Sequence, residues 1–358
     1  MKSRVNTLKG FFEKEKLDGY IVANATNILY FTSFLGGARL LVPREGENVL
    51  YVYGVNYEEA KETARDCRVE LVKRCENPDK KVADEIEVLK LGRVGFDTLN
   101  SSAYLELAKA LKVVKLKARG KLVWELRSVK DETELRHMRR AAELTGEGMK
   151  AAFETIRPGL REYEVAAEIE YAMRRLGSWG VAFDTIVASG VRSAYPHGGC
   201  TDRKIRKGDL IVLDIGAKYQ NYRADLTRTV TVGKPSSKQV RIHEVVREAQ
   251  ERAFQSVRAG VKACDVDVVA RGLIEREGYS EYFVHSLGHG VGLDIHEPPT
   301  LKPESKDKLS VGNVVTVEPG IYIVKFGGVR IEDTVLVQKG GAEKLTKVSY
   351  VLDVGNQF

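Results

Sequence analysis

Four carboxylates occupy matching positions in two stretches that both have the pattern of a β-hairpin. Asp214 and Asp225 belong to the first stretch, and Glu318 and Glu332 belong to the second. If the first turn is centred on 219–220, Asp214 and Asp225 face each other across the strand pair, with Cβ atoms about 5 Å apart. Opposed like charges repel, and a carboxylate inside an apolar strand is costly unless something compensates it. A shared metal ion supplies that compensation, so the pattern indicates a metal site.

An internal repeat contains both hairpins. The matched segments are 207–216 with 311–320, 222–227 with 329–334, and 152–160 with 253–261. A repeat of this kind indicates a duplicated structural unit. It predicts a domain of two similar halves, each with helices outside and a hairpin inside, related by a pseudo-two-fold axis. We expect the carboxylates of both hairpins to converge on that axis.

A histidine completes the predicted ligand set. His289 lies between Gly288 and Gly290, which suit a close approach of the backbone to a bound species. One imidazole with four carboxylates suits Mn²⁺, Co²⁺ or Fe²⁺ better than a structural, thiolate-rich zinc site. Five such ligands are too many for one small divalent ion. They suit two ions about 3.5–4 Å apart, with Asp225 and Glu332 as bridges.

Structural ion pairs are the alternative for these acids. Any one of them could pair with Arg223, Arg228 or Arg330. Four matched positions in duplicated hairpins favour the metal site over that alternative. A single loop histidine such as His197 is more often a surface residue than a ligand, and its significance comes from the other histidines nearby in the sequence.

Length and composition set the class of protein. The chain has 358 residues, 43% of them hydrophobic and 30% charged, which predicts two domains of a soluble globular protein. No apolar run approaches the ~20 residues of a membrane span, and we expect a cytoplasmic protein with no membrane partner. The net charge of +7 is mild and lacks a basic-aromatic groove pattern, so we expect no nucleic-acid partner. Four cysteines show neither metal spacing nor a disulfide framework.

The order of predicted elements divides the chain. Residues 1–120, beginning with a helix at 3–15, alternate helix and strand patterns, which predicts a small α/β domain with a mixed sheet. That stretch contains no histidine, and we place no catalysis there. We expect a linker at 121–130 and the catalytic domain at 131–358. Its predicted helices are 131–156, 162–176, 236–258 and 264–276.

The predicted ligands resemble the metal site of the "pita-bread" metallopeptidases. The matching residues are Asp214, Asp225, His289 in Ser-Leu-Gly-His-Gly-Val-Gly, Glu318 in Val-Glu-Pro-Gly-Ile-Tyr, and Glu332 in Gly-Gly-Val-Arg-Ile-Glu-Asp-Thr. The chain is similar to the Xaa-Pro branch (family M24B), which includes prolidase and aminopeptidase P. Motif-level similarity covers 181–336, and a creatinase-like N-terminal domain is matched more loosely at 27–30. The resemblance implies an α+β fold, with a pita-bread domain preceded by a smaller α/β domain.

The resemblance also implies a role for each ligand. Asp214 binds one ion, His289 and Glu318 bind the other, and Asp225 and Glu332 bridge the two. Glu318 is in addition the candidate general acid/base for the bridging water.

Further residues of the family's pocket have counterparts here. The resemblance implies that His296 hydrogen-bonds the scissile carbonyl oxygen, and that His197 and His285 contact the leaving proline and its carboxylate side. Arg330 is expected to orient a carboxylate, either that of Glu332 or that of the substrate.

The activity implied is hydrolysis of Xaa-Pro bonds by a hydroxide that bridges two divalent ions, with Phe183 at the floor of the proline pocket. The expected ions are Mn²⁺ or Co²⁺, with Fe²⁺ or Zn²⁺ as alternatives. The expected partners are proline-containing dipeptides or short peptides and a second copy of the chain in a homodimer. We favour a dipeptidase (prolidase) over an aminopeptidase P that acts on longer peptides. A non-catalytic peptide-binding module is the hypothesis from another class.

Overall fold

The computed structural model describes residues 3–354 and divides into two compact units, Met1–Arg127 and Ser128–Phe358. The expected linker at 121–130 is mostly helix α7 (Gly120–Ser128), and the division falls at the end of that helix. Residues 1–2 and 355–358, the outermost positions of the expected domains, lie outside the described residues. None of the helices within 3–354 has the length and apolar character needed to cross a bilayer.

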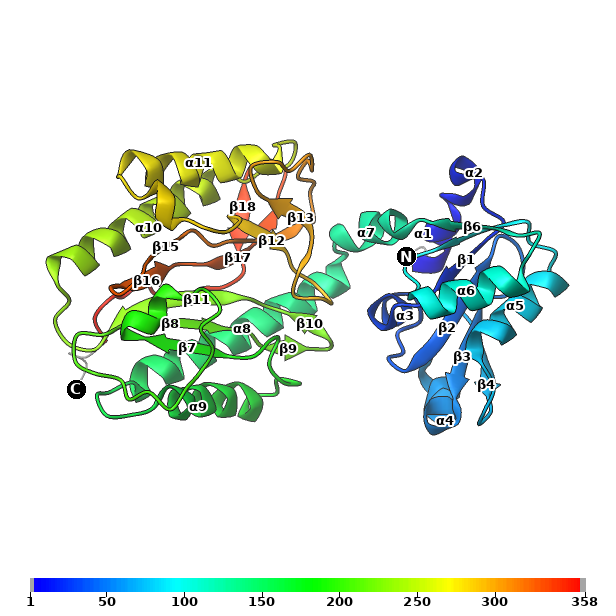
Figure 1. Cartoon of the computed structure of the whole chain (residues 1–358), viewed down its shortest axis with the longest axis horizontal. Helices are drawn as coiled ribbons and strands as arrows, with labels where there is room; N and C mark the ends of the chain where they lie inside the picture. The colour runs from blue at the N-terminus through cyan, green and yellow to red at the C-terminus, as the bar shows by residue number, and fades with distance from the viewer. Residues whose placement is uncertain (1–2, 355–358) are drawn as a thin grey trace. The chain divides into compact units, whose positions relative to one another are not determined.

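The N-terminal unit is built on one mixed sheet (Figure 1). The strand order is β4-β3-β2-β1-β5-β6; β2 pairs antiparallel with β1 and β3, and the other pairs are parallel. The strands are β1 (Gly19–Val22), β2 (Gly37–Pro43), β3 (Val49–Tyr53), β4 (Arg68–Val72), β5 (Arg93–Phe96) and β6 (Lys115–Ala118). The helices are α1 (Arg4–Lys9), α2 (Phe12–Glu15), α3 (Ala25–Thr32), α4 (Gly54–Thr63), α5 (Pro78–Val88) and α6 (Ser101–Ala110). The mixed sheet predicted for this part is confirmed.

Local hydrogen bonds explain where three of these helices begin. Asn24, Asn77 and Asn100 each precede a helix and accept a hydrogen bond from a backbone N–H of its first turn. The prediction of one helix over 3–15 is wrong, because α1 ends before Gly10, a poor helix former.

The C-terminal unit contains two helix pairs with strands between them (Figure 1). The helices are α8 (Glu132–Thr155), α9 (Glu162–Arg175), α10 (Ser237–Ser256) and α11 (Ala263–Arg276). The strands of the first half are β7 (Ile186–Ser189), β8 (Leu210–Ile215), β9 (Lys218–Tyr219), β10 (Tyr222–Arg223) and β11 (Leu226–Thr231). Those of the second half are β12 (Gly288–Gly290), β13 (Glu297–Leu301), β14 (Val314–Val317), β15 (Gly320–Ile323), β16 (Gly327–Arg330), β17 (Asp333–Val337) and β18 (Ala342–Lys344).

The internal duplication extends to matched hydrogen bonds. Gly159 donates its N–H to the carbonyl oxygen of Ile205 at 2.9 Å, and Gly260 donates to Leu309 at 2.8 Å. The two donors are 101 positions apart and the two acceptors are 104 positions apart. These are the offsets of the repeated segments in the sequence, so the two bonds occupy equivalent places in the two halves. Both glycines have a positive φ, +97° and +91°, which L side chains rarely adopt. The predicted arrangement of two similar halves is confirmed.

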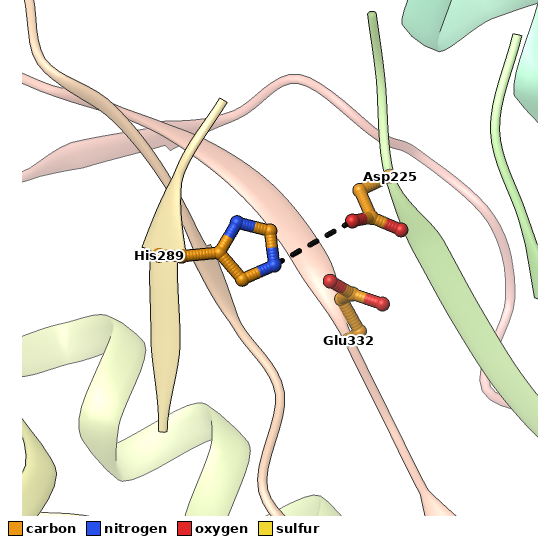
Figure 2. A group of neighbouring side chains, drawn as sticks. All are labelled: Asp225, His289 and Glu332. Atoms are coloured by element: carbon orange, nitrogen blue, oxygen red, sulfur yellow. Dashed lines mark ion pairs between the residues drawn. The ribbon is translucent and has the colours of Figure 1, made fainter. Parts of the chain in front are cut away.

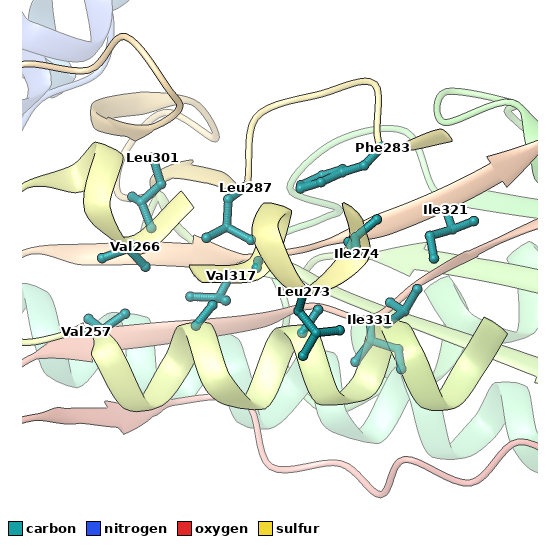
Figure 3. Packing of buried hydrophobic residues seen from close by; sticks show 14 of the residues in the cluster. Val257, Val266, Leu273, Ile274, Phe283, Leu287, Leu301, Val317, Ile321 and Ile331 are labelled. Carbon is teal, nitrogen blue, oxygen red and sulfur yellow. The ribbon is translucent and has the colours of Figure 1, made fainter. Parts of the chain in front are cut away.

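Each half has its own apolar core. In the first half, α8 and α9 pack on β7, β8 and β11. In the second, α10 and α11 pack on β14 to β17, as Figure 3 shows for residues such as Leu273, Ile274 and Val317. Full burial of one such side chain stabilises the fold by about 1.5–3 kcal/mol. The two cores hold the hairpins rigidly between the helix pairs.

The predicted register of the first hairpin is wrong. β8 and β11 pair Asp214 with Thr227 rather than with Asp225. The turn lies at Gln220 and Asn221, one position later than predicted, and both residues have a positive φ, 49° and 66°. Such two-residue turns match the twist of the flanking strands and usually carry glycine, which is missing here. In the second hairpin, β14 pairs Val317 with Asp333 of β17, and β15 pairs Gly320 with Arg330 of β16. Both pairings continue in the same register, which places Glu318 opposite Glu332 as expected.

Candidate metal centre

One cavity of the C-terminal unit brings the predicted site residues together. Its volume is about 650 Å³. The predicted residues that line it are Phe183, His197, Asp214, Asp225, His285, His289, His296, Glu318, Arg330 and Glu332. They come from both halves, so the duplicated hairpins do converge.

Three of the predicted ligands form the tightest group. Asp225, His289 and Glu332 each place one ligand atom within 4.8 Å of the other two (Figure 2). Nε2 of His289 lies 3.7 Å from Oδ2 of Asp225 and 3.2 Å from Oε1 of Glu318. The other ring nitrogen, Nδ1, lies 3.0 Å from the carbonyl oxygen of Gly290. That contact orients the ring and directs Nε2 toward the carboxylates, as in metal-binding histidines.

Two carboxylate oxygens at the site are buried without a donor among the described residues. They are Oδ1 of Asp214 and Oε1 of Glu332. A buried acceptor without a partner is rare and costly. A cation would satisfy both oxygens, so the donor set fits divalent ions rather than a site completed by protein contacts alone.

Charges at the site act on one another strongly. Burial and the negative charges nearby raise the pKa of Asp225 and of Glu332 well above the usual range. Burial also opposes ionisation of Glu318 and His289, but their hydrogen bond, their mutual attraction and the other charges nearby together outweigh it, lowering the pKa of Glu318 to about 2 and raising that of His289 to about 9. If all four carboxylates were ionised, the site would therefore carry more negative charge than the protein itself compensates.

A pair of threonines links the two hairpins at the site. Thr334 donates its hydroxyl to the carbonyl oxygen of Asp225 at 2.8 Å, and Thr227 donates its hydroxyl to Oε2 of Glu332 at 2.6 Å. Each threonine stands two residues after a carboxylate of its own hairpin and contacts the carboxylate residue of the other. These threonines were not predicted from the sequence, although the spacing acid-x-Thr is repeated in both hairpins and indicates them.

Arg330 contacts the carboxylate of Asp214 rather than that of Glu332. Its Nη2 donates to Oδ2 of Asp214 at 2.6 Å, and its Nη1 donates to the hydroxyl of Tyr322 at 2.7 Å. Of the two carboxylates expected for Arg330, Glu332 is therefore not the one that it contacts, and its contact with the carboxylate of the substrate stays a prediction. Arg330 comes from β16, and reaches Asp214 on β8 because the hairpins of the two halves meet there.

Among the described residues, only one predicted ligand forms an ion pair with one of the three arginines considered as alternatives to a metal. Arg330 pairs with Asp214, whereas Arg228 pairs with Asp333, which is not a predicted ligand. Arg223 donates to the backbone carbonyl of Leu293 at 3.0 Å. Structural pairing therefore does not account for the group of acids as a whole.

The pocket histidines differ in their freedom to meet a substrate. Nε2 of His285 lies 2.9 Å from the hydroxyl of Tyr322, and Nδ1 lies 2.8 Å from the carbonyl oxygen of Ser286. Burial lowers the pKa of His285. The exposed ring of His296 stands edge-on to His289 at 4.3 Å, and partial burial and the charge of His289 lower its pKa. Tyr322 was missed in the sequence, although it lies in the motif that contains Glu318.

Known proteins match both units. Residues 136–339 match metallopeptidase family M24, and residues 4–129 match the creatinase/prolidase N-terminal domain. The chain belongs to metallopeptidase family M24. It is 43% identical over 353 residues to the Xaa-Pro dipeptidase of Pyrococcus furiosus, covering 97% of this chain and 98% of that protein.

Solved structures of M24 relatives have the same fold. The prolidase of Pyrococcus horikoshii has a TM-score of 0.91 at 40% identity, covering 97% of this chain and 98% of that one. The X-Pro aminopeptidase of Thermotoga maritima has a TM-score of 0.87 at 36% identity, covering 95% and 99%. These matches confirm the predicted α+β fold with its pita-bread domain, and the chain is a metallopeptidase.

Proposed function

We propose that this metallopeptidase hydrolyses Xaa-Pro dipeptides with two divalent metal ions. The convergence of five oxygen and nitrogen ligands from both halves on one cavity carries the proposal. The names of two relatives, the Xaa-Pro dipeptidases of Pyrococcus furiosus and Pyrococcus horikoshii at 43% and 41% identity, support the choice of substrate.

The ligands divide between two ions. Asp214 would hold one ion, His289 and Glu318 the other, and Asp225 and Glu332 both. Divalent ions held there would polarise the peptide carbonyl and lower the pKa of a water molecule, which makes the water nucleophilic near neutral pH.

The side chains of the cavity would position the substrate and move its protons. Glu318 would accept a proton from the attacking water and deliver it to the proline nitrogen, which must be protonated as the peptide bond breaks. His296, which is exposed to the cavity, would donate a hydrogen bond to the scissile carbonyl oxygen. His197 and His285 would contact the proline and its carboxylate, above a floor formed by Phe183.

The alternative activity is that of an aminopeptidase P. The X-Pro aminopeptidase of Thermotoga maritima shares the fold at 36% identity, somewhat below the 40% of the Pyrococcus horikoshii prolidase. We therefore place the chain with the dipeptidases. The proposal includes Mn²⁺ or Co²⁺ as the ions, with Fe²⁺ or Zn²⁺ as alternatives, a homodimer and a cytoplasmic location.

A substrate comparison tests the proposal. The purified protein, loaded with Mn²⁺ or Co²⁺, is assayed on Met-Pro, on a Met-Pro-Xaa tripeptide and on Met-Ala. We expect rapid cleavage of Met-Pro and little of the other two. Preference for the tripeptide would establish the aminopeptidase alternative, and tight metal binding without cleavage of any proline peptide would favour the peptide-binding module.

A further inference from the structure

A buried glutamate lies behind the loop that carries His197. Glu162, the first residue of α9, has no exposed surface. Its Oε1 accepts hydrogen bonds from the backbone N–H and the hydroxyl of Ser189, at 2.8 and 2.7 Å. Its Oε2 accepts from the backbone N–H and hydroxyl of Thr201 at 2.9 and 2.6 Å, and from Nη1 of Arg192 at 2.6 Å. One carboxylate thus joins both ends of the loop.

Arg192 extends this contact to the residue next to the histidine. The loop turns at Tyr195 to Gly198, closed by a hydrogen bond from the N–H of Gly198 to the carbonyl oxygen of Tyr195 at 3.0 Å. His197 stands in this turn and lines the cavity. Arg192 donates to the carbonyl oxygen of Gly198, the next residue. We call Glu162 and Arg192 together the Glu162 clamp.

The second half contains a comparable pair behind His285. Asp267 of α11 is fully buried and binds Arg271 through both oxygens, each at 2.8 Å. Asp267 also accepts from the N–H of Leu287 at 3.1 Å. Arg271 donates to the carbonyl oxygens of Phe283 and His285 at 3.1 and 3.0 Å. We call Asp267 and Arg271 the Asp267 clamp.

The duplication did not supply these two clamps. The repeat offset of 101 residues matches Glu162 to Ala263 and Asp267 to Ala166. Helix α11 begins with Ala263 at the position where α9 begins with Glu162. A helix can therefore start at this position of the repeat without an acid. A buried ion pair is weak evidence for stability, because desolvation offsets much of the attraction. Each half therefore has its own clamp at its own position, in both cases next to a histidine that lines the cavity.

We propose that the two clamps are positioning devices that hold the proline-binding side of the cavity in a preformed shape. The Glu162 clamp positions His197, and the Asp267 clamp positions His285. This inference rests on the proposed function for the identity of the substrate, but the contacts themselves do not. If the loop is already ordered, no conformational entropy is lost in ordering it when the substrate binds. Loss of a clamp therefore weakens substrate binding more than it slows the chemical step.

Glu162→Gln tests the first clamp. The variant keeps the volume of the side chain, but its single carbonyl oxygen cannot accept at once from the Ser189 donors on one side and from the Thr201 and Arg192 donors on the other. We expect KM for Met-Pro to rise about 10-fold with kcat changed less than about 3-fold, and the metal content to stay that of the wild type. Hydrogen–deuterium exchange supplies a readout without turnover, because the N–H group either of Ser189 or of Thr201 loses its acceptor. Peptides covering 189–201 should exchange faster.

Two further variants separate positioning from general destabilisation. Val246→Ala removes a buried apolar contact from the α10 core and should lower the melting temperature with KM and the exchange of 189–201 unchanged. Asp267→Asn should raise KM as well, but speed exchange in 283–287 rather than in 189–201. If Glu162→Gln does not fold, the double variant Glu162→Gln/Arg192→Met removes both charges of the clamp and carries the same test.

The outcomes distinguish this inference from the proposed function. Wild-type KM and wild-type exchange in 189–201 for Glu162→Gln would overturn the clamp, as would changes no different from those of Val246→Ala. If the wild-type protein does not cleave Met-Pro, the proposed function fails. The exchange experiment still decides in that case whether the clamp orders the loop.

Discussion

Replacing Asp333 with asparagine is expected to destabilise the C-terminal unit strongly. Asp333 follows Glu332 and is fully buried. Its Oδ1 accepts from Arg228 at 2.9 Å and from Thr346 at 3.0 Å, and its Oδ2 accepts from Gln250 at 3.0 Å. All of these groups donate to a carboxylate. An asparagine would turn an NH₂ group, itself a donor, toward the donors on one of the two oxygens, and it would also remove the negative charge.

The expected loss follows from the burial of the partner. Arg228 is 1% exposed, so the variant leaves a guanidinium inside the protein without its carboxylate. Removing one partner of a buried ion pair costs about 3–5 kcal/mol. Since 1 kcal/mol shifts the melting temperature of a unit of 150–250 residues by about 2–4 °C, Asp333→Asn should lower it by roughly 6–20 °C.

Thermal unfolding monitored by the fluorescence of Trp179 measures this shift. A Trp124→Phe background leaves Trp179 as the only tryptophan of the chain, and it belongs to the C-terminal unit. Glu143→Gln is the matched control, because its pair with Arg140 is exposed on α8, and should shift the midpoint by less than about 2 °C. A shift as small as the control's for Asp333→Asn would refute the reasoning that this buried pair is needed.

The remaining predictions concern the metal ligands and one buried histidine. Asp225→Asn or Glu332→Gln should lower turnover at least about 100-fold and reduce the metal content, while the circular dichroism spectrum stays unchanged. Full activity of either variant would show that the replaced residue is not a metal ligand. Burial, then the charges of Arg247 and Arg228, lower the pKa of His243 to about 4, so the fold favours the neutral ring. The unfolding free energy should therefore be unaffected above pH 6.5 and fall by about 3 kcal/mol between pH 6.5 and 4. His243→Gln should flatten that part of a urea-denaturation pH profile, and an unchanged slope would contradict the assignment.

The ligands could be found from the sequence because the duplication repeats them. Asp214 and Glu318 each follow a similar run of apolar residues, and the position of each hairpin is set by local patterns. The register of the first hairpin could not be found in the same way. It depends on the positive φ of Gln220 and Asn221. A glycine would have indicated such a turn in the sequence, but neither of these residues is a glycine.

Long-range partners account for most of what the sequence did not show. Arg330 was expected to orient the carboxylate of Glu332 or that of the substrate, but the carboxylate that it contacts belongs to Asp214, 116 residues away. Glu162 looks like an ordinary acid in the first turn of a helix, where most are solvated. Its partners follow it by 27 to 39 residues, on a loop whose path only the tertiary structure determines.

The central claim is that the duplicated hairpins bind two metal ions. Crystals of the protein grown with Mn²⁺ and measured at its absorption edge test this most directly. We expect two anomalous peaks about 3.5–4 Å apart among Asp214, Asp225, His289, Glu318 and Glu332. A single peak there would contradict the dinuclear site, and the absence of any peak among these residues would contradict the metal centre itself.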